Sequence, residues 1–186
     1  MKVLAFSGSN SALSINHELL KYCTQFLRFP FDILDLRNYE IPMFNIDLEQ
    51  EKGFSAELVA LYQTLITYDA YIISIPEHNG NFPAFFKNII DWLTRIERGF
   101  FQNKPILLLN AAPGQQGGKS VLQQAEKSFS FFSGNVVGKF ILPNFHSFIT
   151  QDKLDLEKTE MAKELSDLME SFENKLGSET QLEEKI

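Results

Sequence analysis

The sequence has few of the features that would place a protein outside the cell or in a membrane. It contains one cysteine, Cys23, so no disulfide can form within the chain. This cysteine falls on the apolar side of an expected helix, and we interpret it as a small buried hydrophobe. No apolar run approaches the roughly 20 residues of a membrane helix, and the opening apolar stretch is too short for a signal peptide. We therefore predict a cytoplasmic protein with no membrane partner.

Positive charge and metal-ligand patterns are scarce as well. The 17 Lys and Arg residues are outnumbered by 24 Asp and Glu residues, and most of the acidic excess lies between residues 151 and 186. The absence of a basic stripe argues against nucleic acid as a partner. His17, His78 and His146 lack ligand spacing, so no metal site is predicted. No serine lies in the G-x-S-x-G elbow that is typical of hydrolases.

Two kinds of apolar segment alternate along the chain: near-continuous apolar runs, and stretches with apolar residues at helical spacing. Near-continuous apolar runs predict buried strands at Lys2–Phe6, Phe31–Leu36, Ala70–Ile75, Pro105–Leu109 and Val136–Leu142. Helical spacing of apolar residues follows each run, so we predict an α/β fold with a parallel sheet covered by helices on both faces. For five strands the flavodoxin-like order 2-1-3-4-5 is expected. We expect a single three-layer domain over residues 1–176, a long connection at 37–53 and a disordered polar tail at 177–186.

A polar loop follows the first predicted strand. The stretch from Phe6 to Asn16 contains four serines and no charged residue. Small hydroxyl and amide side chains between a strand and a helix let N–H groups and hydroxyls converge on an anion at the positive end of the helix dipole. A single residue of this kind would cap the helix. Their number therefore favours a phosphate-binding loop, in which Ser9, Ser14 and Asn16 hold the phosphate.

Two further loops follow strands three and four. In the expected strand order a ligand binds beyond the C-terminal ends of strands one and three. The segment from Pro76 to Pro83 contains an Asn-Gly turn between two prolines, and its stiff backbone suits the edge of a planar heterocycle. The next loop, 110–120, ends in Gly-Lys-Ser as a phosphate-binding Walker A loop does. Position 113 is proline where that motif requires glycine, which argues against a nucleotide triphosphatase.

These loops resemble the motifs of a known family. Gly8-Ser9 with Ser14-x-Asn16 is similar to the G-S-x-R-x-x-S-x-N loop of the NAD(P)H-dependent FMN reductases. The residues from Pro76 to Trp92 resemble their P-E-Y-N-G-S-x-P-x-x-L-K-N-A-I-D-W signature. The resemblance runs from about residue 1 to 175. It implies a flavodoxin-like fold, FMN as cofactor, NADPH or NADH as a transient co-substrate, and a homodimer or homotetramer. The implied electron acceptor is a small molecule such as a flavin, a quinone, an azo dye or a metal oxyanion.

The resemblance also implies which residues bind the cofactor. In the family the first loop holds the FMN phosphate, the second lies against the isoalloxazine ring, and the third lines the flavin's other edge. The cofactor performs the chemistry, so no side chain is assigned as catalytic. The implied cofactor-binding residues are Ser9, Ser11, Ser14, Ile15, Asn16, Pro76, Glu77, His78, Asn79, Gly80, Ala112, Gly114 and Gly117.

Two positions depart from the family's pattern. Ser11 stands where the family has arginine, so a fixed positive charge is missing from the phosphate loop. His78 replaces a tyrosine beside the ring. Two other classes therefore stay open: a flavin-binding electron carrier, and a non-enzymatic protein that has lost FMN. Phe100-Phe101 and the segment Phe145 to Phe148 fall in connections, where they are candidates to cover a flavin face or a subunit interface.

Overall fold

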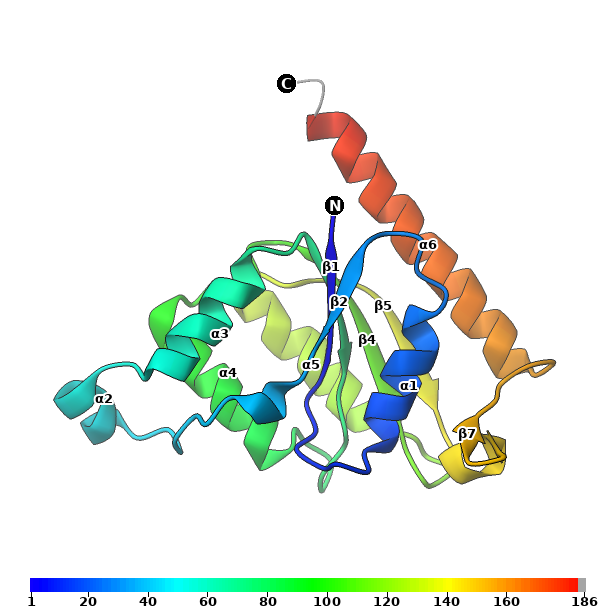
Figure 1. The fold of residues 1–186 in the computed structure, drawn as a ribbon, viewed down its shortest axis with the longest axis horizontal. Helices are drawn as coiled ribbons and strands as arrows, with labels where there is room; N and C mark the ends of the chain where they lie inside the picture. Colours follow the sequence, from blue (N-terminus) through cyan, green and yellow to red (C-terminus); the bar gives the residue numbers. More distant parts are fainter. Residues whose placement is uncertain (184–186) are drawn as a thin grey trace.

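The chain folds around a five-stranded parallel sheet in the order β2-β1-β3-β4-β5. The structure is a computed structural model, and it describes residues 1–183. The predicted order of the strands is confirmed, and Figure 1 shows β2 beside β1. The strands are β1 (Val3–Ser7), β2 (Phe31–Leu34), β3 (Ala70–Ser74), β4 (Pro105–Ala111) and β5 (Asn135–Leu142).

Helices cover both faces of this sheet (Figure 1). One face carries α1 (Ile15–Thr24) and α6 (Glu160–Glu183), and the other carries α3 (Ala56–Ile66), α4 (Ala84–Ile96) and α5 (Lys119–Phe131). Cys23 of α1 is fully buried in the first of these layers, and burial raises the pKa of its thiol. Within residues 1–183, no helix combines the length and the apolarity needed to cross a bilayer.

The central strands are buried on both faces, as the near-continuous apolar runs predict. Leu4 and Phe6 of β1 pack toward α3 and α4, whereas Val3 and Ala5 pack toward α1 and α6, because successive side chains of a strand point to opposite faces. Parallel pairing brings Ser7 at the end of β1 beside Ser74 at the end of β3. The loops that follow β1 and β3 therefore begin side by side.

The connection between β2 and α3 contains two elements that the apolar pattern does not predict. They are the short helix η1 (Leu36–Asn38) and α2 (Ile46–Lys52). Helix α2 buries none of its residues, so it has no apolar stripe to reveal it in the sequence. Caps at its two ends stabilise it instead: the Asn45 side chain accepts a hydrogen bond from the Asp47 N–H, and Gly53 ends the helix at φ 68°.

The C-terminal region begins after β5. Helix η2 (Phe145–Phe148) and the short hairpin of β6 (Ile149–Thr150) and β7 (Lys153–Leu154) lead into α6. Helix α6 continues through residues 177–183, part of the stretch for which the sequence predicts a disordered tail. Leu176 of this helix is fully buried, and the residues that follow it in the sequence include good helix formers. The rest of the predicted tail, 184–186, lies outside the described residues.

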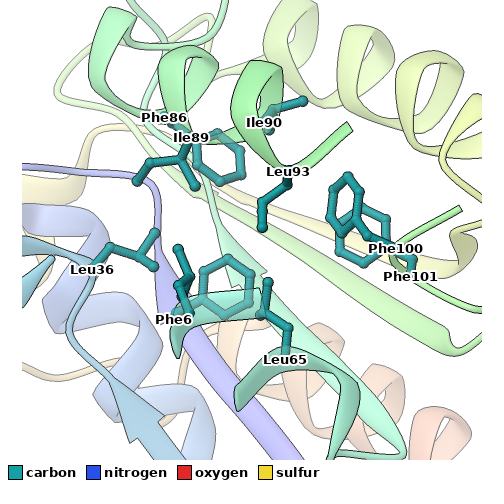
Figure 2. Close-up of a pocket in the computed structure, with 10 residues that line it drawn as sticks. Phe6, Leu36, Leu65, Phe86, Ile89, Ile90, Leu93, Phe100 and Phe101 are labelled. Atoms are coloured by element: carbon teal, nitrogen blue, oxygen red, sulfur yellow. The ribbon is translucent and has the colours of Figure 1, made fainter. Parts of the chain in front are cut away.

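An apolar core lies between the sheet and α3, α4 and η1. Figure 2 shows Phe6, Leu65 and Leu93 converging there with Phe100 and Phe101. The space they leave is about 10 Å³ and wholly apolar, so it is a packing defect with no donor or acceptor for a ligand. Phe100 and Phe101 are 1% and 2% exposed, and Phe145 is also buried. Phe100, Phe101 and Phe145 are therefore core side chains carried by connections, and the expectation that they cover a flavin face or a subunit interface is wrong. Phe148 is half-buried, and for it the expectation stays a prediction.

Candidate cofactor site

Serine hydroxyls define the conformation of the loop after β1. The Ser7 Oγ accepts from the Ser9 N–H at 3.3 Å, the Ser9 Oγ from the Ser11 N–H at 3.2 Å, and the Ser11 Oγ from the Leu13 N–H at 3.2 Å. We call this series the serine ladder. Each hydroxyl accepts within the loop and keeps its own hydrogen, and those of Ser9 and Ser11, which line the hollow described below, can donate to a ligand.

The ladder leads to the N-terminus of α1. Ser14 caps this helix, with its Oγ accepting from the His17 N–H at 3.4 Å. The N–H groups of Ile15 and Asn16, at the first two positions of the helix, have no acceptor within an α-helix. These N–H groups and the positive end of the helix dipole form a place for an anion. The donors that this loop offers are backbone N–H groups and hydroxyls, and a phosphate fits that donor set.

The Asn16 side chain points into the protein and is 2% exposed. Its Oδ1 accepts from the Ser74 hydroxyl and from the Ala111 N–H, each at 2.9 Å, and its Nδ2 donates to the Ala111 carbonyl at 2.9 Å. The amide thus joins α1 to the ends of β3 and β4. The prediction that Asn16 contacts the cofactor therefore depends on its backbone N–H, because its side-chain atoms are already bonded.

The loop after β3 contains a tight turn at the predicted Asn-Gly pair. The His78 N–H donates to the Asn81 carbonyl and the Asn81 N–H donates to the His78 carbonyl, each at 3.0 Å. Asn79 and Gly80 have φ of 52° and 76°, the left-handed values that favour these residue types. Pro76 is buried and His78 is exposed. The rigid turn therefore presents His78 at the edge of the site.

Glu77 has a role that the sequence does not reveal. Its Oε2 accepts from the N–H of Val121, in the first turn of α5, at 2.9 Å. A carboxylate thus takes the position at the start of α5 where a Walker A loop would hold a phosphate. This bond argues further against a nucleotide triphosphatase, and it ties the loop after β3 to the loop after β4.

The loop after β4 is packed closely against its own strand. A Cβ on Gly118 would lie 2.1 Å from Cγ of the buried Asn110, and the Asn110 Nδ2 donates to the Ile75 carbonyl at 2.7 Å. Gly117 has φ 64°, and a Cβ there would lie 2.4 Å from Ile141. The backbone path therefore requires glycine at both positions, and the contact of Gly117 with a flavin stays a prediction.

The first and second loops and the start of the third surround one open hollow of about 250 Å³. Nine of the thirteen predicted cofactor residues line it: Ser9, Ser11, Ser14, Ile15, Asn16, Pro76, Glu77, His78 and Ala112. Leu13, Ala111 and Pro113 also line it and were not predicted. Four predicted residues are absent from the lining: Asn79, Gly80, Gly114 and Gly117. Leu13 is 93% exposed, and the signal that could have marked it is its place as the one large apolar residue between Ser7 and Ser14.

Two residues of the motif-like helix α4 hold the connection after β2. The Asn88 Oδ1 accepts from the Phe44 N–H at 2.7 Å, and the Trp92 Nε1 donates to the Pro42 carbonyl at 2.8 Å. Phe44 also packs edge-on against the Trp92 ring. Asn88 and Trp92 therefore shape the protein beside the site, and neither lines the hollow.

His17 gives the site a pH-dependent element. Burial lowers the pKa of this half-buried imidazole from its ordinary value of 6.5, and the Arg37 charge lowers it further. The unfolded chain then binds more protons than the folded chain just below that value, so the free energy of unfolding falls as pH falls.

We expect His17→Gln to reduce this loss of stability between about pH 7.5 and pH 5.5, as measured by urea unfolding at the two pH values. His146→Gln, at an exposed position in η2, is the control. An identical fall in stability for wild type and His17→Gln would contradict the assignment.

No group of three or more metal-ligating side chains was found in the part of the chain that the structure describes. A parallel sheet of this order with its ligand site at β1 and β3 defines the flavodoxin-like class of nucleotide-binding proteins.

Comparison with known families gives the same class. The sequence pattern of the family described as NADPH-dependent FMN reductase matches residues 1–147. The chain belongs to this family and is an oxidoreductase that uses FMN and NAD(P)H. The donor set of the first loop fits the phosphate of FMN, which agrees with this membership.

Three individual proteins illustrate the similarity. It is 33% identical over 150 residues to the uncharacterized protein MG342 homolog of Mycoplasma pneumoniae, covering 78% of this chain and 89% of that protein. It is 31% identical over 122 residues to a quinone reductase of Escherichia coli, covering 66% of this chain but only 63% of the relative. A solved flavoenzyme NAD(P)H:acceptor oxidoreductase, FerB of Paracoccus denitrificans, superposes with a TM-score of 0.73 at 24% identity, covering 92% of this chain and 94% of that one.

Proposed function

We propose that this chain reduces a quinone or a similar small planar acceptor with electrons from NAD(P)H, through FMN held in the hollow between its first two loops. The observation that carries the proposal is the serine ladder ending at the open N-terminus of α1, opposite the rigid turn at His78. A ligand with a phosphate at one end and a flat ring at the other matches these two ends. The quinone reductase of Escherichia coli supports the choice of acceptor.

In this proposal the residues of this chain bind FMN and orient it. Ser9 and Ser11 donate hydroxyl hydrogens, and Ile15 and Asn16 donate backbone N–H groups, to the phosphate. Pro76 to Gly80 present a stiff backbone to the ring, and the bond from Val121 to Glu77 keeps that segment in place. A bound FMN would supply the redox chemistry, which is hydride transfer from NAD(P)H and two-electron reduction of the acceptor.

The test combines binding and turnover. After incubation with FMN and desalting, we expect the protein to retain a flavin absorption spectrum, and NADPH oxidation by the loaded protein should speed up when a quinone is added. We expect Ser9→Ala to weaken FMN binding about tenfold, because a hydrogen bond to a charged group is lost. Ser130→Ala on α5, whose hydroxyl donates to Lys127, is the control.

Three outcomes would contradict the proposal in distinct ways. A protein that retains no FMN would favour a non-enzymatic role for the fold. A loaded protein that fails to oxidise NAD(P)H would favour an electron carrier. Turnover that ignores quinones but responds to azo compounds or free flavins would correct the acceptor alone.

The oligomeric state stays a prediction. The proposal of a homodimer or homotetramer is supported by large apolar side chains exposed near α2, where Met43 is 70%, Ile46 44% and Phe54 38% exposed. Clusters of exposed apolar side chains are typical of surfaces that contact another protein. Sedimentation or light scattering of the purified protein measures this directly.

A further inference from the structure

The phosphate loop of this chain contains no basic residue. From Ser7 to Asn16 every side chain is neutral, and Ser11 occupies the position where the family's motif has arginine. A phosphate monoester carries close to two negative charges near neutral pH. The backbone and hydroxyl donors of the loop give hydrogen bonds, but they leave that charge without a cationic partner.

A cation reaches the same loop from a different strand. Arg37 lies in η1, just beyond β2, and β2 pairs with β1 in the sheet (Figure 1). The pairing brings the segment that follows β2 beside the loop that follows β1. The Arg37 Nη1 donates to the Ser11 carbonyl at 3.3 Å. The guanidinium therefore contacts the very residue that replaces arginine in the motif.

Asp35 holds this guanidinium in a fixed orientation. Its Oδ1 accepts from the Arg37 Nε at 2.8 Å and its Oδ2 from Nη2 at 2.6 Å, a two-point pairing of carboxylate and guanidinium. The Asp35 Oδ1 also accepts from the Arg37 backbone N–H at 3.0 Å. These bonds occupy one edge of the guanidinium, and Nη1 is left facing Ser11 with a second hydrogen to donate.

The field of Arg37 extends to the start of α1. The Arg37 charge is one cause of the lowered pKa of His17, which lies in the first turn of that helix. The negative charge of Asp35 raises the pKa of His17 and so offsets part of the effect of Arg37. An anion at the N-terminus of α1 would lie within the reach of the same field.

We propose that Arg37 is the cationic residue of the FMN phosphate site, supplied by the segment after β2 in place of the arginine that the loop lacks. Arg37 binds the phosphate end of the cofactor from the outer side of Ser11, and Asp35 orients it. This assignment rests on the proposed function. It makes Arg37 a cofactor-binding residue and Asp35 a positioning residue.

The test compares FMN with riboflavin, which has the same ring and no phosphate. We expect Arg37→Gln to weaken FMN binding about tenfold to a hundredfold, as measured by quenching of flavin fluorescence without NAD(P)H, and to leave riboflavin binding unchanged. Added salt should weaken FMN binding to wild type more than to the variant. Arg37→Lys should recover much of the FMN affinity, because it keeps the charge.

Arg95→Gln is the matched control. Arg95 on α4 pairs with Glu49 through the same two-point geometry, with Nε to Oε2 at 2.8 Å and Nη2 to Oε1 at 3.1 Å. This pair neither lines the hollow nor contacts the serine ladder. The control variant should bind FMN and riboflavin as wild type does.

Several results would overturn the proposal. Unchanged FMN binding in Arg37→Gln would show a surface ion pair with no ligand role. Equal weakening of FMN binding in Arg37→Gln and Arg37→Lys would show that the positive charge of residue 37 is not what binds the phosphate. Equal weakening of FMN and riboflavin would show that Arg37 only supports the loop. An altered preference between NADPH and NADH with FMN binding intact would assign Arg37 to the co-substrate instead. Failure of wild type to bind either flavin would remove the proposed function together with this assignment.

Discussion

Replacing Asn16 by alanine is expected to lower the free energy of unfolding by about 3–5 kcal/mol, because the substitution leaves buried polar groups without partners. The amide of Asn16 makes three hydrogen bonds of 2.9 Å, to the Ser74 hydroxyl and to the N–H and carbonyl of Ala111. An unsatisfied buried donor costs more than the bond it once made contributed. Urea denaturation followed by circular dichroism measures the change.

The neighbouring Asn10 offers a matched control in the same loop. It is exposed, so Asn10→Ala should change the free energy of unfolding by less than about 0.5 kcal/mol. A loss below about 1 kcal/mol for Asn16→Ala would show that water replaces the amide at low cost. The role of Asn16 in joining α1 to β3 and β4 would then be wrong.

Adding a methyl group at Gly118 should have the second large effect. We expect Gly118→Ala to lower the free energy of unfolding by about 3 kcal/mol, since overpacking and a broken buried hydrogen bond both contribute. The new Cβ would lie 2.1 Å from Cγ of Asn110 and would displace the amide that donates to the Ile75 carbonyl. Thermal or urea unfolding measures the loss.

Gly114→Ala provides the control for this substitution. A Cβ at Gly114 meets nothing within 4 Å, so this variant should unfold close to wild type. The double variant Gly118→Ala with Asn110→Ala should lose less stability than the two single variants added together, because the clash disappears once the amide is removed. Strict additivity of the two effects would show that Asn110 is not what limits residue 118.

Much of the fold follows from the apolar pattern. The runs of β1, β3 and β4 are buried on both faces, and such runs stand out in a sequence because nearly every residue is apolar. Short right-handed connections then restrict the strand order. Helix α2 cannot be predicted in this way because it buries no side chain. The assignment of Phe100 and Phe101 is wrong because connections also carry core residues.

The site is predictable in part for a different reason. Serines between a strand and a helix predict an anion-binding loop from neighbouring residues alone. Their hydroxyls accept hydrogen bonds from N–H groups two residues away. Asn16 and Glu77 bond to residues 95 and 44 positions away in the sequence. Nothing local distinguishes an amide that faces a ligand from one that faces a strand. The contact between Arg37 and Ser11 is of the same long-range kind.

The serine ladder bears on the thermodynamics of ligand capture. Because its hydroxyl-to-amide bonds are intramolecular, the loop has its curved shape before any nucleotide arrives. Little conformational entropy is then lost when the anion docks, and the interaction energy is expressed as affinity rather than spent on ordering the chain. The isolated protein should therefore capture its cofactor by rigid docking, with amide exchange in this loop already slow in the apo state.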